Sequence, residues 1–150
     1  MSTPGVQPVA LVADDDEDIR DVLSVVLGDA GMAVVRAEDG RQAVQLLENL
    51  LPEIILLDVQ MPGLSGIEVC WWIRRQRRLA HVPVVLVSAR TSPFEIDAGL
   101  LAGANHYVTK PFTQAQILAV VAKLRSGRPS TTQVLRAPAA VVIPDFGLTH

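Results

Sequence analysis

The sequence predicts an α/β fold in which helices cover both faces of a parallel sheet. Short apolar runs, each too short for a helix, alternate along the chain with segments whose apolar residues recur at helical spacing. The run Ile54–Leu57 is apolar throughout, which is typical of a strand buried on both faces at the centre of a parallel sheet. The expected strands are Val9–Ala13, Met32–Ala37, Ile54–Leu57, Val82–Val87 and Tyr107–Thr109.

Helical segments separate these strands, and polar or glycine residues mark their ends. Asp16 can cap the first helix, whose positive end suits the acidic residues that follow, and Gly31 ends it. Gly103 stops the fourth helix, and Thr113 can cap the fifth. The expected helices run from Asp16 to Gly31, from Gly40 through Leu47, from about Ser65 to Arg78, from Pro93 to Ala102 and from Thr113 to Arg125.

Polar groups follow four of the five apolar runs. Acids at Asp14–Asp16 follow the first run, Asp58 follows the third, Ser88 the fourth and Lys110 the fifth. In open α/β sheets, ligands bind just outside the carboxyl ends of the strands. Asp58 alone could be a turn or cap residue, but acids at this density repel one another unless a cation lies among them. Carboxylate and carbonyl oxygens suit Mg²⁺, so the sequence predicts a magnesium site at this edge.

These residues resemble, in order and in spacing, the motifs of a known family. The matching stretches are Leu11–Asp16, Ile55–Pro62 with Gly66, Val85–Ala89, and Gly103–Ala104 followed by Tyr107–Phe112. Over roughly residues 7–125, the chain is similar to the receiver domain of a bacterial two-component response regulator. The resemblance implies a flavodoxin-like, doubly wound (βα)5 sandwich with a parallel five-stranded sheet of order 2-1-3-4-5. The winding direction of such a sheet switches where the first and third strands carry their acids.

The resemblance implies a role for each polar group that would meet a phosphoryl group. Asp58 is implied to be the phosphoacceptor, Lys110 to contact the phosphoryl group as a point charge, and Ser88 to hydrogen-bond it. Ser88 and Tyr107 are implied to be the switch residues, although Tyr107 would also serve as an aromatic at the edge of the core. The Lys110–Pro111 peptide bond is implied to be cis.

The resemblance also implies which atoms hold the magnesium ion. Asp15 and Asp58 are implied to bind Mg²⁺ directly, together with the backbone carbonyl of Gln60. Asp14 is implied to act directly or through a water molecule. Asp16, one position further along, is interpreted as the helix cap rather than as a ligand.

Length and composition fit one such domain with short flanking segments. A 150-residue chain with 49% hydrophobic residues can form a single substantial core. Residues 1–8 are interpreted as a flexible N-terminal lead and residues 9–125 as the receiver domain. Residues 126–150 are interpreted as a linker or tail, or as the start of an effector region.

Charge, cysteine content and hydropathy exclude several functional classes. The formal net charge of −3 argues against direct nucleic acid binding by this domain. The single cysteine, Cys70, fits a reducing cytosol. No signal peptide and no apolar stretch of membrane-spanning length is visible, so we expect a cytoplasmic location and no membrane partner.

The resulting hypothesis is a phosphorylation-controlled signalling switch of a two-component phosphorelay. Its expected partners are a sensor histidine kinase and a downstream effector protein or domain, and a homodimer is a further option. The expected chemistry is self-directed phosphoryl transfer and autodephosphorylation, so the chain is not expected to be an enzyme in the wider sense.

Two alternatives remain at this stage. The first is a Mg²⁺-dependent phosphatase with an aspartyl nucleophile, which usually carries a second acid two residues after the first. Here Val59 and Gln60 follow Asp58, so that acid is missing. The second is a receiver used only as a protein-contact module, against which the complete set of polar groups argues.

Trp71 and Trp72 are the only tryptophans, and the helical pattern does not place both in the core. The face of the third helix toward the sheet is expected to contain Ile67, Cys70 and Ile73, with Val69 as a further candidate. The two rings lie roughly 100° and 200° round the helix from Cys70. Either one ring folds over the helix edge and is half-buried, or at least one is an exposed anchor for a partner or for a second copy of this chain.

Overall fold

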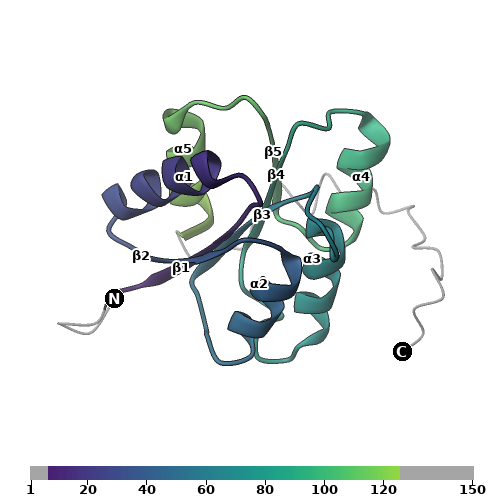
Figure 1. Ribbon diagram of the computed structural model, residues 1–150, viewed down its shortest axis with the longest axis horizontal. Helices are drawn as coiled ribbons and strands as arrows, with labels where there is room; N and C mark the ends of the chain where they lie inside the picture. Colours follow the sequence, from purple (N-terminus) through teal and green to yellow (C-terminus); the bar gives the residue numbers. More distant parts are fainter. Residues whose placement is uncertain (1–6, 126–150) are drawn as a thin grey trace.

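The computed structural model describes residues 7–125, which form five strands and five helices in strict alternation (Figure 1). The strands are β1 (Val9–Ala13), β2 (Ala33–Ala37), β3 (Ile54–Asp58), β4 (Val84–Ser88) and β5 (His106–Thr109). The helices are α1 (Glu17–Asp29), α2 (Gly40–Leu47), α3 (Gly66–Arg75), α4 (Pro93–Leu101) and α5 (Gln114–Arg125). The expectations for residues 1–6 and 126–150 lie outside the described residues. No helix between residues 7 and 125 is both long and apolar enough to cross a bilayer.

The five strands are parallel and lie in the order β2-β1-β3-β4-β5. Helices α1 and α5 cover one face of the sheet, and α2, α3 and α4 cover the other (Figure 1). The predicted fold class and strand order are therefore confirmed. The winding direction switches between β1 and β3, and the crevice at that point is where ligands of such sheets bind.

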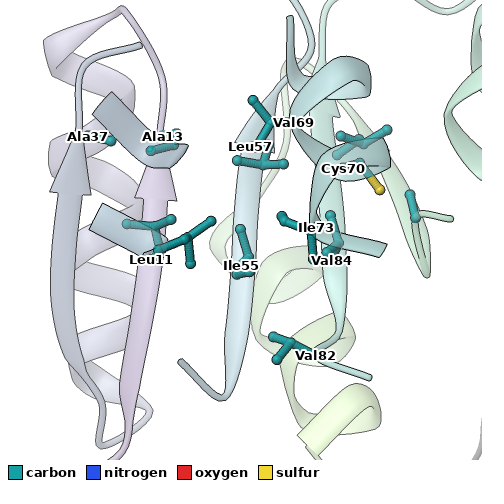
Figure 2. Packing of buried hydrophobic residues seen from close by; sticks show 14 of the residues in the cluster. Leu11, Ala13, Ala37, Ile55, Leu57, Val69, Cys70, Ile73, Val82 and Val84 are labelled. Carbon is teal, nitrogen blue, oxygen red and sulfur yellow. The ribbon is translucent and has the colours of Figure 1, made fainter. Parts of the chain in front are cut away.

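Strand β3 is buried along its whole length because helices cover both of its faces. Its side chains alternate between the faces. Ile55 and Leu57 join the cluster under α2, α3 and α4, whereas Ile54 and Leu56 join the cluster under α1 and α5. Figure 2 shows Ile55 and Leu57 facing the buried side of α3. Full burial stabilises by about 1.5–3 kcal/mol for each such side chain, so β3 is firmly anchored beneath the site at its tip.

Reciprocal capping pairs fix the start of two helices. At α3, the Ser65 hydroxyl accepts from the backbone N–H of Glu68, and the Glu68 carboxylate accepts from the backbone N–H of Ser65. At α5, the Thr113 hydroxyl accepts from the N–H of Gln116, whose side-chain oxygen accepts from the N–H of Thr113. The cap predicted at Thr113 is confirmed, and such caps contribute about 1 kcal/mol each.

Helix α3 ends at Arg75, three residues before the predicted end at Arg78. The backbone of Gln76 is extended (φ −92°, ψ 116°), which breaks the helix, and Leu79 in the following turns is fully buried. The guanidinium of Arg78 then donates to the carbonyl oxygens of Leu47 and Leu50 at the end of α2, the second at 2.9 Å. The arginine-rich segment therefore joins two helices instead of extending one.

Strand β4 begins at Val84, two residues after the predicted start at Val82. The side chain of Asn105 accepts from the Val84 N–H at 2.8 Å, next to the point where β4 and β5 begin to pair. Strand β2 begins at Ala33, one residue after Met32. Gly31 and Gly103 follow α1 and α4 at positive φ (91° and 110°), as their predicted roles require.

Arg74, near the end of α3, is a half-buried connector. Its guanidinium donates to the carbonyl oxygens of Gly103 (2.9 Å), Val82 (2.8 Å) and Ala80 (3.2 Å) and to the Asn105 side chain (2.8 Å). Burial lowers the pKa of this guanidinium. The five-donor fork of arginine suits several acceptors at once, so Arg74 ties α3 to the start of β4 and to the turn before β5.

Candidate functional site

The carboxyl ends of four strands bring the predicted polar residues to one edge of the sheet. Asp14 directly follows β1, Asp58 is the last residue of β3, Ser88 is the last of β4, and Lys110 directly follows β5. The strands lie in register, with Ala13 opposite Leu57 and Ser88 opposite Thr109, so these residues end at a similar level. Asp14, Asp58 and Ser88 are 0%, 5% and 0% exposed. Buried carboxylates are costly unless they are paired, so this edge needs compensating charge.

Lys110 supplies part of that charge. Its ammonium nitrogen Nζ lies 3.0 Å from Oδ2 of Asp14 and 3.5 Å from Oδ1 of Asp58. Carboxylate oxygens of Asp14, Asp15 and Asp58 lie within 4.8 Å of one another, and Asp15 is exposed. Three carboxylates against one ammonium leave negative charge in excess, and Asp15 connects the cluster to solvent.

Backbone groups hold the acids in place. Oδ1 of Asp14 accepts from the N–H of Asp16 at 2.9 Å, and Oδ1 of Asp58 accepts from the N–H of Gln60 at 3.2 Å. The side chain of Asp16 caps α1, as predicted, because it accepts from the second and third N–H groups of that helix. Arg20, which the sequence did not single out, donates to the backbone carbonyl of Asp14 at 2.7 Å. Asp16 and Arg20 thus support the cluster from α1.

Burial raises the pKa of the Asp58 carboxyl to about 6, and the negative charge of Asp14 adds to this shift. Lys110 and the Gln60 N–H oppose it because they favour the ionised form. For Lys110, burial lowers the pKa, but the hydrogen bond to Asp14 and the charges of Asp14 and Asp58 raise it overall. The ammonium is therefore charged at neutral pH, whereas Asp58 gives up its proton at about pH 6.

Gly66 lets α3 begin directly against the tip of β3. A Cβ atom at this position would lie 2.2 Å from the carbonyl oxygen of Asp58 and 2.9 Å from its carbonyl carbon. No side chain fits between two backbones at such distances, so only glycine permits this packing. The N–H of Gly66 donates to the carbonyl of Val59 at 3.0 Å, which closes the loop that carries Gln60.

Ser88 and Tyr107 both hydrogen-bond to the backbone of Arg90 in the loop between β4 and α4. The Ser88 hydroxyl accepts from the Arg90 N–H at 3.0 Å, and the Tyr107 hydroxyl donates to the Arg90 carbonyl at 2.8 Å. The Arg90 guanidinium pairs with Glu95 at 2.9 Å. With its amide oriented so that the oxygen faces Arg90, Gln60 accepts from the same guanidinium at 2.9 and 3.0 Å. These contacts join the tips of β3, β4 and β5 through one loop.

The acidic cluster fits a hard divalent cation. Its donors are carboxylate oxygens from Asp14, Asp15 and Asp58, which are the ligand type that Mg²⁺ prefers. Asp15 is exposed, and Mg²⁺ usually keeps several of its water molecules in a protein site. The predicted cis peptide bond between Lys110 and Pro111 is also present.

The chain is thus a doubly wound α/β domain with an acidic cluster and a paired ammonium at its switch point, the place where such sheets bind ligands. Residues 10–122 match the family described as the response regulator receiver domain. The chain therefore belongs to this family, as its resemblance implied.

Relatives with longer chains share the domain. The chain is 46% identical over 116 residues to the uncharacterized transcriptional regulatory protein YrkP of Bacillus subtilis, a match that covers 77% of this chain and 48% of YrkP. It is 35% identical over 142 residues to the DNA-binding response regulator MtrA of Mycobacterium tuberculosis, covering 93% of this chain and 61% of MtrA. The chain thus spans about half of YrkP and three-fifths of MtrA.

Solved structures of receiver domains superpose closely. The chemotaxis response regulator CheY4 of Vibrio cholerae matches with a TM-score of 0.75 and 30% identity, covering 79% of this chain and 99% of CheY4. The receiver domain of DrrB, activated with BeF3, matches with a TM-score of 0.73 and 30% identity over 81% of this chain and 99% of that domain. The alignments cover almost the whole of CheY4 and of the DrrB receiver domain, so the shared fold spans the entire domain.

Proposed function

We propose that this domain is a phosphorylation-controlled switch that accepts a phosphoryl group on Asp58 from a sensor histidine kinase in the presence of Mg²⁺. The observation that carries the proposal is the cluster of Asp14, Asp15 and Asp58 with Lys110 at the tips of β1, β3 and β5. Family membership supports the signalling role.

In the proposed reaction, a carboxylate oxygen of Asp58 attacks the phosphorus of a phosphohistidine. The new bond joins this oxygen to phosphorus, and the bond from phosphorus to the imidazole nitrogen breaks. The electron pair of the broken bond stays on the imidazole, which then takes up a proton, and Asp58 becomes an acyl phosphate. Such transfers depend mainly on positioning and on neutralising charge at the phosphoryl oxygens.

This chain supplies that positioning and part of the neutralisation. Lys110 lies within 3.5 Å of Asp58 and would pair with a phosphoryl oxygen attached there. Asp14, Asp15 and Asp58, with the Gln60 carbonyl, would hold Mg²⁺. When bound, the ion would supply positive charge to the transferring oxygens.

The proposed switch acts through the loop at Arg90. Ser88 accepts from the Arg90 N–H, and Tyr107 donates to the Arg90 carbonyl, so both polar groups depend on the position of one residue. A phosphoryl group on Asp58 offers Ser88 a charged acceptor, which is a stronger partner than a neutral one. If the Ser88 hydroxyl turned toward the phosphoryl group, the hydrogen bond from the Arg90 N–H to Ser88 would weaken. The loop between β4 and α4 and the Tyr107 side chain could then move together.

The wider role follows from the longer relatives. MtrA is described as a DNA-binding response regulator, so we propose that a downstream effector protein or domain reads the state of this receiver. This domain itself carries net negative charge and is not proposed to touch nucleic acid. Because the phosphoryl donor and acceptor must meet, and the proposed donor is the cytoplasmic domain of a kinase, we propose that this domain is also cytoplasmic.

Intact mass measured after incubation with acetyl phosphate and Mg²⁺ tests the proposal. The wild type should gain one phosphoryl group and lose it again on standing, whereas Asp58→Asn should gain none. Asp16→Asn is the matched control, since Asp16 caps α1 and is not in the cluster; it should be labelled like the wild type.

Other outcomes would favour the alternatives. Labelling of Asp58→Asn to full extent would remove Asp58 as the acceptor. Sustained turnover of many equivalents of a phosphomonoester would indicate a phosphatase. No labelling of the wild type, and no beryllofluoride binding, would leave only the contact module.

A further inference from the structure

The outward face of α3 carries both tryptophans between two opposite charges. Glu68, Trp71, Trp72 and Arg75 follow one another at the i, i+3, i+4 and i+7 positions of one helical face. The opposite face, with Val69, Cys70 and Ile73, is fully buried against the sheet. Both tryptophans are half-buried, so neither is the fully exposed anchor that one alternative expected, and each covers part of the helix edge.

A large apolar hollow lies along this face. It has a volume of about 550 Å³ and runs across α3 between α2, which contributes Val44, and α4, which contributes Ala98, with Ala102 directly after α4. Both indole rings line it, and Glu68 is its only charged lining residue. Trp72 also borders a second, more polar hollow of about 360 Å³ on its other side. The ring of Trp72 therefore stands between two depressions.

The charges on this face make it complementary to itself. Glu68 lies as far before the midpoint between Trp71 and Trp72 as Arg75 lies after it. A two-fold axis through that midpoint sets a second α3 antiparallel to the first. Glu68 of each copy then faces Arg75 of the other, and the tryptophans of the two copies meet in the centre. Such a patch, used identically by both subunits, is what an isologous dimer requires.

Arg75 is already held where this contact needs it. Its guanidinium carbon lies 4.3 Å from the centroid of the Trp71 ring. This cation–π contact keeps the charge beside the aromatic surface and leaves the planar guanidinium able to bind a carboxylate. Glu68 is exposed, although one of its oxygens accepts from the Ser65 N–H.

We propose that the α3 face is a docking surface for a second copy of this chain, in an antiparallel two-fold contact centred on Trp71 and Trp72. Half-buried aromatics in the centre with a charged rim are the arrangement of interface hot spots. The inference does not rest on phosphoryl transfer and holds whether or not Asp58 accepts phosphate.

Tryptophan fluorescence of the 150-residue chain gives the first test, because Trp71 and Trp72 are its only tryptophans. Emission and sedimentation are followed from about 1 µM to about 1 mM, the range of weak to moderate association. The indole emission should shift to shorter wavelength together with the change from monomer to dimer mass. A monomer mass at every concentration would overturn the proposal, including the case in which residues 126–150 cover the rings within one chain.

Charge exchange gives a sharper test. Glu68→Arg places two like charges opposite each other at both ends of the contact, and so does Arg75→Glu. Each single variant should dimerise at least about tenfold more weakly than the wild type. An equimolar mixture of the two variants restores both opposite-charge pairs, so it should form a heterodimer about as strong as the wild-type dimer.

Two controls separate this contact from others. Trp71→Lys with Trp72→Gln should weaken the dimer roughly 30-fold or more, with the fold retained by circular dichroism. Arg77→Glu reverses an exposed charge two residues from Arg75 and should leave the dimer at its wild-type strength. Failure of the mixed variants to associate, or a dimer that survives the loss of both tryptophans, would show that the copies meet elsewhere or not at all.

Discussion

Opposing interactions at Asp58 leave the pKa of its carboxyl above the ordinary value. Burial and the charge of Asp14 favour its protonated form, whereas Lys110 and the Gln60 N–H favour the carboxylate. Its pKa of about 6 exceeds the ordinary value of 3.8. The native protein therefore binds this proton more tightly than the unfolded chain does, and the contribution of Asp58 to stability falls as pH rises from about 4 to about 6.

The raised pKa of Asp58 makes the effect of removing its charge depend on pH. In the absence of divalent cations, Asp58→Asn should become more stable relative to the wild type as pH rises from 4 to 7. The gain should be on the order of 2–3 kcal/mol and should level off above the native pKa. Lys110 stays charged across this window, because its pKa is raised above an already high value. Urea unfolding at several pH values measures the difference, and a difference that does not change with pH would contradict the raised pKa.

Residues placed by the end of a strand could be predicted from the sequence. Residues whose side chains hydrogen-bond to distant parts of the chain could not. Asp14, Asp58 and Lys110 sit at strand ends, so a correct order of strands brings them together. Arg74 and Arg20 act through long side chains that select carbonyl oxygens only after the fold exists. Nothing in local spacing distinguishes them from the exposed arginines nearby.

At the scale of elements, the backbones of β3 and α3 approach each other closely beside the site. A methyl group at position 66 would overlap the backbone of Asp58, which cannot move away as a flexible side chain could. The motif that carries the family resemblance includes Gly66, yet its physical reason, the approach of two backbones, became visible only in the structure.

Gly66→Ala should therefore destabilise the protein by about 1–3 kcal/mol, the usual cost of overpacking, even though alanine favours a helix. Labelling at Asp58 by acetyl phosphate should also slow, because the strand tip must shift. The matched control is Gly28→Ala in α1, where an added Cβ has no atom within 4 Å. That change should stabilise by about 0.5–1 kcal/mol and leave labelling unchanged. Equal effects of the two substitutions on stability would refute the close-approach argument.

The C-terminal end of α3 is a boundary that the local sequence did not predict. Apolar spacing and four arginines favour continuation to Arg78, and the local pattern contains no glycine or proline to stop it. The helix ends at Arg75 because Leu79 is fully buried, with Arg78 capping the end of α2. Val69, Cys70 and Ile73 are fully buried on the face toward the sheet, whereas Ile67 is only partly buried, packing against the core cluster and also lining the apolar hollow.

At the scale of the whole molecule, two hydrophobic clusters meet across one sheet, and the acidic cluster lies at the edge that both share. The clusters anchor β1 and β3 side by side and so hold Asp14 and Asp58 close together despite their repulsion. The fold thus holds mutually repelling carboxylates at one edge of the sheet, and a bound cation would reduce this repulsion. Stability and ligand binding are coupled through this single edge.

The last prediction follows from that coupling. Mg²⁺ should raise the melting temperature, since it binds the native cluster and finds no such arrangement in the unfolded chain. At a concentration ten times the dissociation constant the gain is about 1.4 kcal/mol, or several degrees for a domain of this size. Asp15→Asn should lose most of this shift, because it removes an exposed ligand without disturbing the core. Asp16→Asn should keep the full shift, because asparagine caps a helix about as well as aspartate does and residue 16 lies outside the cluster. A calorimetric titration in which Asp15→Asn and the wild type respond equally to Mg²⁺ would place the ion outside this cluster.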